Sequence, residues 1–231
     1  MMNVPEPDDS YYFEILKNDQ RDEVLQFLFD NFVKDEPLNR AANITNEEIR
    51  ICLNLGLDRA LKNEISILAR SKIDNKIVGC MINSVWNRND IEKKSKDVKE
   101  EDFEFKTSRK QVETIGEILN DLHESFWSTQ GEDIQTVIHF EISSVNIHHR
   151  FKGIASKFMN FTENEELLKS VSASGIVAEV TSFGNQRLLE KRNYTTLLST
   201  PLSSKLDENG EQVLSCDDGT TEVRLMFKKI L

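Results

Sequence analysis

The segment Arg150-Phe151-Lys152-Gly153-Ile154-Ala155 has the residue types and spacing to bind a diphosphate. It follows a run of β-branched and aromatic residues, 136–145, and precedes apolar residues at helical spacing, 154–168. Where a strand turns directly into a helix, the first helical amides have no partner within the helix and attract anions. Gly153 lets a phosphate approach the backbone closely, and the two basic residues add positive charge. We therefore expect a phosphate-binding turn here.

The pattern Arg-x-x-Gly-x-Ala also resembles the acetyl-CoA pyrophosphate loop of the GNAT superfamily of acetyltransferases. A motif this short has a simpler alternative, a surface turn shaped by Gly153 with solvated basic residues. The patterns G-x-x-x-x-G-K-S/T and G-x-G-x-x-G of other phosphate loops are absent from the sequence. The resemblance implies that acetyl-CoA binds with its pyrophosphate on the amides of 151–156 and its pantetheine beside the strand near 143–145. The implied binding residues are Ser143, Val145, Arg150, Phe151, Lys152, Gly153, Ile154, Ala155 and Ser156.

A second candidate for chemistry is the segment Asp35-Glu36-Pro37-Leu38, which follows a predicted helix. Its composition alone is typical of a solvated turn. The segment, however, resembles the DEPL-type segment of insect and nematode arylalkylamine N-acetyltransferases, a branch of the same superfamily. The resemblance implies that Glu36 lies near the acceptor amine as the general base. An alkylamine with a pKa near the lysine value of about 10.4 is protonated at pH 7, and only the neutral amine attacks a thioester. A buried carboxylate can bind the ammonium and accept its proton.

His139 and Glu141 lie two residues apart on the predicted strand 136–145, so their side chains share one face. In vertebrate arylalkylamine N-acetyltransferases, histidines of the equivalent strand relay the amine proton to water, and His139 matches one of these positions. A buried structural histidine is the alternative. The sequence contains no G-x-S-x-G elbow, so a Ser-His-Asp hydrolase of that type is not indicated.

The segment from Ser182 to Tyr194 resembles the strand-to-helix segment of the GNAT enzymes. In many of these enzymes a tyrosine before Glu-Lys protonates the leaving thiolate, but this chain has Leu189 there. The resemblance therefore leaves Ser182 or water as the expected proton donor. Asn193 replaces the usual glycine after the helix, and asparagine tolerates the left-handed conformation required there.

The length and composition favour one globular domain with a substantial core, because the chain has 231 residues, 38% of them hydrophobic and 30% charged. No apolar run reaches the roughly 18 residues of a membrane span, and the N-terminus lacks signal-peptide features, so we expect a cytoplasmic protein. The net charge of −11 disfavours nonspecific nucleic-acid binding. Cys52, Cys80 and Cys216 are far apart, which indicates free thiols rather than disulfides or a zinc site.

The sequence predicts elements that match the GNAT resemblance, which covers about residues 11–231. Residues 1–10 are expected to form a mobile tail, 11–231 a single GNAT domain, and 87–108 a polar loop or insertion within it. Strands are expected at 11–16, 65–69, 77–85, 136–145, 175–180, 198–206 and 221–230. Helices are expected from 18 to before Pro37 and at 45–61, 112–126, 154–168 and after Ser182. The resemblance implies a mixed α/β fold, with a twisted sheet of about seven strands that is splayed near its centre and has helices on both faces.

These features together predict transfer of the acetyl group of acetyl-CoA to a small primary amine. An arylalkylamine such as dopamine, tyramine or serotonin is the leading acceptor, with direct attack on the thioester and Glu36 as base. A polyamine or another small amine is one alternative, and a noncatalytic acyl-CoA-binding module is another. We expect no metal, no nucleic-acid or membrane partner, and a monomer or weak homodimer.

Overall fold

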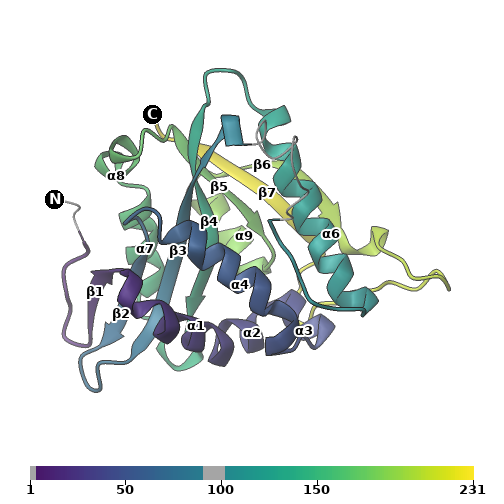
Figure 1. Ribbon diagram of the computed structural model, residues 1–231, viewed down its shortest axis with the longest axis horizontal. Coiled ribbons are helices and arrows are strands. Elements are labelled where there is room, and N and C mark those ends of the chain that lie inside the picture. The colour runs from purple at the N-terminus through teal and green to yellow at the C-terminus, as the bar shows by residue number, and fades with distance from the viewer. Residues whose placement is uncertain (1–3, 91–101) are drawn as a thin grey trace.

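The computed structural model describes residues 4–90 and 102–231. At its centre is a seven-stranded sheet in the order β1-β2-β3-β4-β5-β7-β6 (Figure 1). The strands are β1 (Tyr11–Ile15), β2 (Ile67–Ser71), β3 (Ile77–Asn87), β4 (Thr136–Val145), β5 (Gly175–Val180), β6 (Thr195–Pro201) and β7 (Glu222–Lys229). Neighbouring strands are antiparallel except β4 and β5, which are parallel. The predicted mixed sheet is confirmed.

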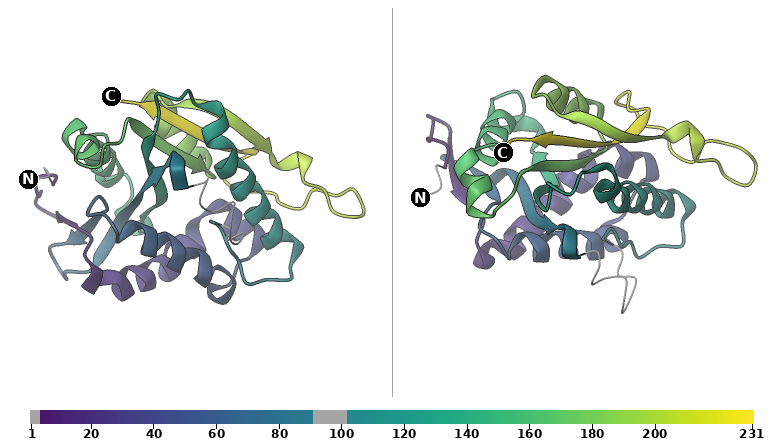
Figure 2. Two further views of the ribbon diagram at one scale, coloured as in Figure 1. Left: turned by 45° about the horizontal axis from the view of Figure 1, so that its top comes forward. Right: turned by 90° about the horizontal axis from the view of Figure 1, so that it is seen from above.

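Helices cover both faces of this sheet (Figures 1 and 2). On one face lie α1 (Arg21–Asp30), α2 (Phe32–Asp35), α3 (Pro37–Ala42), α4 (Asn46–Ala60) and α6 (Lys110–Ser125). On the other lie α7 (Ile154–Thr162), α8 (Glu165–Ser170) and α9 (Phe183–Lys191). Each set buries its apolar side chains in a separate core, so the sheet divides the interior into two hydrophobic layers.

The sheet is splayed where β4 meets β5. These strands pair only at Ile138 with Ile176 and His139 with Val177, and then diverge. From Phe140 to Val145, the β4 backbone pairs with β3 alone among the described strands. The predicted splay is therefore confirmed, and it exposes one edge of β4 along the cleft described below.

A β-bulge lies in β4 beside this splay. Ile82 of β3 pairs with Ile142, but the next residue, Asn83, pairs with Phe140, so Glu141 is the extra residue. Bulges change the direction of side chains and are frequent next to active sites. Here Phe140 packs with the α7 core, whereas Ile142 belongs to the α4 core. The bulge thus interrupts the strict alternation of faces at the point where the strands separate.

One long helix was predicted at 154–168, and this prediction is wrong. The structure has two helices, α7 and α8, because the side chain of Asn164 accepts hydrogen bonds from the amides of Glu166 and Leu167. A side chain in this role is an N-cap and begins a new helix. The break lets α8 turn and bury Leu167 and Leu168.

The strand predicted at 198–206 is also misplaced, because β6 runs from Thr195 to Pro201. Proline has no N–H with which to continue a strand ladder. A short 3-10 turn, Leu202–Ser204, follows it and buries Leu202. The short helix α3 was not predicted either; it begins at Pro37, which is buried along with Leu38.

Two segments predicted to be polar and solvated contain ordered contacts. Of the expected tail, residues 1–3 lie outside the described residues, and Asp8 forms an ion pair with Lys157 of α7 at 2.8 Å. Of the expected polar loop, 91–101 lie outside the described residues, whereas Phe103 is only 8% exposed. Phe103 departs from the expectation because its ring packs against those of His123 and His139.

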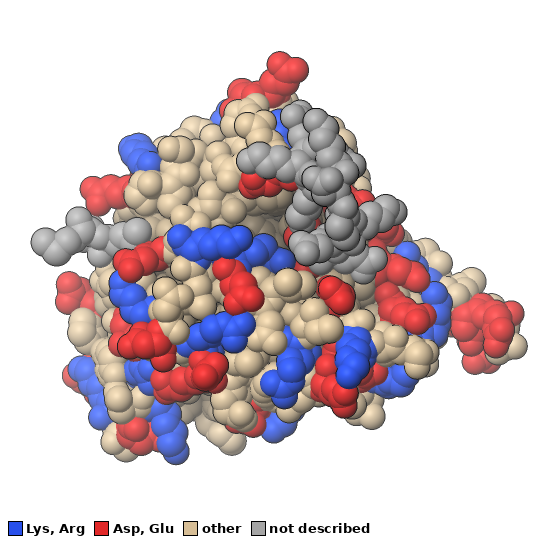
Figure 3. Space-filling model, in the orientation of Figure 1, with Lys and Arg blue, Asp and Glu red and all other residues tan. Residues whose placement is uncertain are grey.

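The surface over α1 and α4 carries interspersed charges of both signs (Figure 3). Ion pairs join some of them, for example Arg21 with Asp58 at 2.8 Å. The helices in the described ranges are all too short or too polar to cross a lipid bilayer. The three cysteines are free thiols, as predicted.

Candidate active site

A cleft of about 770 Å³ passes through the splay between β4 and β5. Its lining includes Ile49 and Leu53 from the α4 core and Ile154 and Met159 from the α7 core. The cleft therefore opens a route from one face of the sheet to the other. Its volume falls within the range of about 300–1,000 Å³ that is typical of small-molecule sites. Two ligands that approach from opposite faces can meet inside it.

The turn predicted to bind phosphate lies at one end of this cleft. Gly153 has φ +80° and precedes the first turn of α7, whose leading amides have no acceptor within the helix. A Cβ atom added to Gly153 would meet nothing within 4 Å, so the space above the backbone is open. The lining includes Arg150, Phe151, Gly153, Ile154, Ala155 and Ser156. Lys152 is exposed beside the turn and does not line the cleft.

Arg150 connects this turn to the Asp35-Glu36 segment. Its Nη2 atom donates to Asp35 Oδ2 at 2.8 Å, and its Nε atom donates to the carbonyl of Val145 at 3.0 Å. A second link joins the same two regions, because Asn146 donates to Asn31 at 2.7 Å. The two segments that carried the sequence resemblance thus lie side by side at the cleft.

Glu36 lines the cleft between α2 and α3. Helix α2 ends at Asp35 because a residue before proline avoids the helical region, and Glu36 is indeed extended at φ −72°, ψ 130°. Pro37 then occupies the first position of α3, where its missing N–H costs nothing. The carboxylate caps α3 by accepting the Asn39 amide at Oε2, at 2.7 Å.

The other carboxylate oxygen of Glu36, Oε1, is buried and has no hydrogen-bond partner among the residues that the structure describes. Burial raises the pKa of Glu36 above its ordinary value, and the Asn39 amide opposes that rise only in part. A carboxylate with a raised pKa and an unpaired oxygen is suited to accept a proton near neutral pH.

The remaining predicted residues lie along the same cleft. Ser143 and Val145 line it from the free edge of β4. Ser182 lines it as the N-cap of α9, where its Oγ atom accepts the Asn185 amide at 3.3 Å. The described lining residues include Leu189 but no tyrosine, and Tyr194 is buried elsewhere with a raised pKa caused first by burial. A tyrosine proton donor is therefore not brought into the described part of the cleft.

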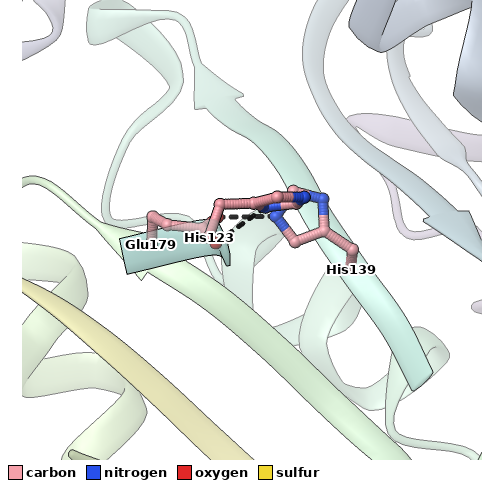
Figure 4. Close-up of side chains that lie close together, drawn as sticks. All are labelled: His123, His139 and Glu179. Carbon is pink, nitrogen blue, oxygen red and sulfur yellow. Dashed lines mark hydrogen bonds and ion pairs between the residues drawn. The ribbon is translucent and has the colours of Figure 1, made fainter. Parts of the chain in front are cut away.

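His139 belongs to a buried cluster of charged groups below the cleft (Figure 4). Its Nε2 atom lies 2.6 Å from Glu179 Oε2, and its Nδ1 atom lies 3.4 Å from Glu141 Oε1. Glu179 also contacts His123 Nδ1 at 3.0 Å, and Glu141 contacts Arg59 at 2.7 Å. The contact with Glu141 confirms that these two residues of β4 share one face.

The charges in this cluster depend on one another. Burial alone would lower the pKa of His139, but the carboxylates of Glu179 and Glu141 outweigh burial and raise it to about 10. Burial opposes ionisation of both carboxylates, yet Arg59 and His139 hold the pKa of Glu141 well below its usual range, and the histidines do the same for Glu179. A histidine that is already protonated cannot accept an amine proton. The contacts of His139 are those of a buried ion-pair cluster, and a proton relay through His139 stays a prediction.

His123 and Glu179 were not singled out from the sequence. With His139 they form a set whose potential ligand atoms lie within 4.8 Å of one another, so among the described residues this set could hold a metal ion. Separations of 2.6 and 3.0 Å between their nitrogen and oxygen atoms are hydrogen-bond lengths, which fits a cluster of paired charges. The sequence feature that could have indicated this cluster is Glu179, a charged residue within the apolar run 175–180.

The α4 side of the cleft has an apolar wall. Phe103 and Phe105 line it together with Ile115 and Leu119 of α6 and Ile49 and Leu53 of α4. Cys52 is also in the lining, and burial raises the pKa of its thiol to about 12, so it stays neutral. Phe103 and Phe105 were missed because they lie in a predominantly polar stretch of sequence.

This chain is similar to solved structures, but sequence comparison finds no matching family. No protein-family model and no curated protein sequence matches this chain. Among solved structures, arylalkylamine N-acetyltransferase 2 from Aedes aegypti has 26% identity and a TM-score of 0.78, with 96% of this chain and 99% of that chain covered.

Two further structures share the fold. The mosquito arylalkylamine N-acetyltransferase like 5b has 16% identity and a TM-score of 0.74, with 95% of this chain and 100% of that chain covered. The polyamine N-acetyltransferase of Drosophila melanogaster has 13% identity and the same TM-score of 0.74, with 95% and 99% covered. These similarities confirm the GNAT fold and the predicted resemblance to insect arylalkylamine N-acetyltransferases, and they support an N-acetyltransferase.

Proposed function

From the GNAT N-acetyltransferase fold of this chain, we propose that it transfers the acetyl group of acetyl-CoA to the primary amine of a small arylalkylamine, of the dopamine, tyramine or serotonin type. The observation that carries the proposal is the cleft through the sheet, lined both by the phosphate turn and by the buried carboxylate of Glu36. A diphosphate bound at the turn and the proposed base Glu36 would lie in one continuous space.

The residues present fit acetyl-CoA. The open space above Gly153 leaves the turn accessible to a diphosphate, and the first amides of α7 offer donors for it. The free edge of β4 near Ser143 and Val145 offers backbone groups to an extended chain such as pantetheine. When bound, acetyl-CoA supplies a thioester carbon that a neutral amine can attack. Backbone amides near Val145 would polarise its carbonyl group.

Glu36 binds the ammonium group of the acceptor through Oε1, which has no hydrogen-bond partner within residues 4–90 and 102–231. It then accepts a proton from that nitrogen, directly or through water, and so generates the attacking amine. Ser182, or water, gives a proton to the departing thiolate and regains one from the nitrogen, which loses its second proton as the amide forms. The Ser182 oxygen accepts the Asn185 amide, which leaves the hydroxyl hydrogen free to be donated. Because a thiol has a pKa of about 8.5, this acid need not be strong.

The charges around the cleft favour an acceptor with a single ammonium group. Of the acidic residues in its described lining, Asp35 pairs with Arg150, Glu141 with Arg59, and Glu179 with His123 and His139. Asp218 accepts backbone amides, including that of Phe183. Among these carboxylates, Glu36 is thus the one with a buried oxygen that has no hydrogen-bond partner in the described residues. A polyamine would bring further ammonium groups against the apolar wall, whereas an aromatic ring fits that wall.

The test is thiol release from acetyl-CoA with tyramine, dopamine, serotonin, spermidine and a lysine peptide as acceptors. We expect kcat/KM for the three aromatic amines to exceed that for spermidine and the peptide by at least tenfold. A higher kcat/KM for spermidine than for the aromatic amines would indicate that the acceptor is a polyamine. No turnover with any amine, together with acetyl-CoA binding measured by calorimetry, would favour the noncatalytic binding module.

A further inference from the structure

Two phenylalanine side chains are exposed in the described part of the chain, and both line the mouth of the cleft. Phe151 is 106% exposed and lies on the turn between β4 and α7, whereas Phe183 is 48% exposed and lies at the start of α9, after β5. The two rings therefore flank the splay, one on each strand-to-helix turn. Exposed aromatic rings at the rim of a ligand cleft are surface that a ligand can cover.

Phe151 combines this exposure with an unfavourable backbone conformation. Its φ of +61° is in the left-handed region, which bulky residues rarely adopt because Cβ approaches the neighbouring carbonyl. No packing of the ring compensates for that cost, since the side chain is fully exposed. Outliers of this kind cluster at ligand-binding sites, where a bound ligand supplies the missing contacts.

This inference rests on the proposed binding of acetyl-CoA at the same cleft. We propose that Phe151 stacks on the adenine ring of acetyl-CoA. The diphosphate lies between the pantetheine arm and the adenosine, so a molecule with its pantetheine along β4 and its diphosphate at Gly153 leaves the cleft with its adenosine at this turn. Phe151 is two residues from Gly153 and presents an uncovered ring there. Adenine is the aromatic part of the molecule. Stacking it on the phenylalanine ring removes one face of each ring from water.

The experiment compares dissociation constants for CoA and for 4′-phosphopantetheine, which lacks the adenosine and the two phosphates attached to it, by calorimetry. The variants are Phe151→Ala, Phe151→Gly and Phe151→Trp, with Ile147→Ala as control because Ile147 is 57% exposed nearby but does not line the cleft. Phe151→Ala and Phe151→Gly should each weaken CoA binding by about fivefold to a hundredfold, the range found when an aromatic ring that stacks on a base is removed. Their affinity for 4′-phosphopantetheine, and both affinities of Ile147→Ala, should stay within twofold of wild type.

Phe151→Trp should bind CoA at least as tightly as wild type, since it keeps a ring in place. Glycine adopts positive φ without strain, so Phe151→Gly separates the ring from the backbone conformation. If Phe151→Gly binds CoA like wild type, or if both ligands weaken equally in Phe151→Ala, stacking on adenine is excluded. If wild type binds neither ligand, the proposed function fails instead, so the two failures are distinguishable.

Discussion

Replacing Glu36 with glutamine tests the proposed base with little change in shape. The amide oxygen of glutamine can still accept the Asn39 amide that Glu36 accepts at 2.7 Å, so the cap of α3 is retained. Glutamine cannot accept a proton from an amine. Because positioned general bases contribute about 10²- to 10⁴-fold, kcat/KM should fall by that factor, which corresponds to about 3–5 kcal/mol of activation free energy.

Stability and cofactor affinity should hardly change in Glu36→Gln. The variant removes a carboxylate whose ionisation burial already disfavours, so we expect the free energy of unfolding to stay within about 1 kcal/mol of wild type. Glu36→Ala, in contrast, should lose about 1 kcal/mol because its cap is absent. The affinity for acetyl-CoA should be unchanged in both variants. Asp30→Asn, on the exposed surface of α1, is the matched control and should retain wild-type turnover.

The assay is thiol release with tyramine as a function of pH. Burial raises the pKa of Glu36 above 4.5, so the acid limb of the wild-type kcat/KM profile should lie above pH 4.5. Glu36→Gln should lack this limb. Turnover of Glu36→Gln within threefold of wild type at pH 7, with the acid limb intact, would refute the assignment of Glu36 as the base.

Three further changes test the phosphate turn, the buried cluster and one helix end. Gly153→Ala places a Cβ at φ +80°, so it should lower the free energy of unfolding by about 1–2 kcal/mol. Its affinity for acetyl-CoA, measured by calorimetry, should fall at least tenfold. An unchanged affinity would count against this turn as the phosphate site. The pKa of His139, raised from 6.5 to about 10 between Glu141 and Glu179, means that its stabilisation is present below pH 6.5 and lost as pH rises toward 10. In urea titrations His139→Gln should therefore be less stable than wild type by about 3–5 kcal/mol at pH 6.5, and the difference should shrink by pH 10; a pH-independent difference would contradict the charged state. Asn193 has φ +64°, so Asn193→Gly should raise the melting temperature, with a gain of about 0.5–1 kcal/mol; a decrease would show that the asparagine side chain is required there.

Much of the fold was predictable because the signals that specify it are local. Pro37 ends the helix before it, Thr45 and Glu48 form the capping box that begins α4, and Asn193 adopts the left-handed conformation expected after α9. Strand periodicity located β4 and β5 at their observed bounds. The errors also have local causes, namely the Asn164 cap that divides 154–168 and the early end of β6 at Pro201.

The candidate site was predictable only in part. The phosphate turn and the Asp35-Glu36 segment could be recognised, because each is a short pattern of residue types. Their proximity was not readable from those patterns, and the ion pair between Arg150 and Asp35 joins residues 115 positions apart. The wall formed by Phe103 was likewise hidden in a polar stretch.

By itself, then, the sequence predicted most of the helices and strands, and it supplied the candidate phosphate turn at Gly153 and the candidate base Glu36. The tertiary structure alone decided that β4 and β5 separate after His139, that Oε1 of Glu36 is buried with no hydrogen-bond partner among the described residues, and that Glu179 and Glu141 raise the pKa of His139. The physical reason is the separation along the chain over which each kind of interaction acts. Capping, proline and periodicity act over a few residues, whereas burial and pKa depend on neighbours that only the folded chain brings together.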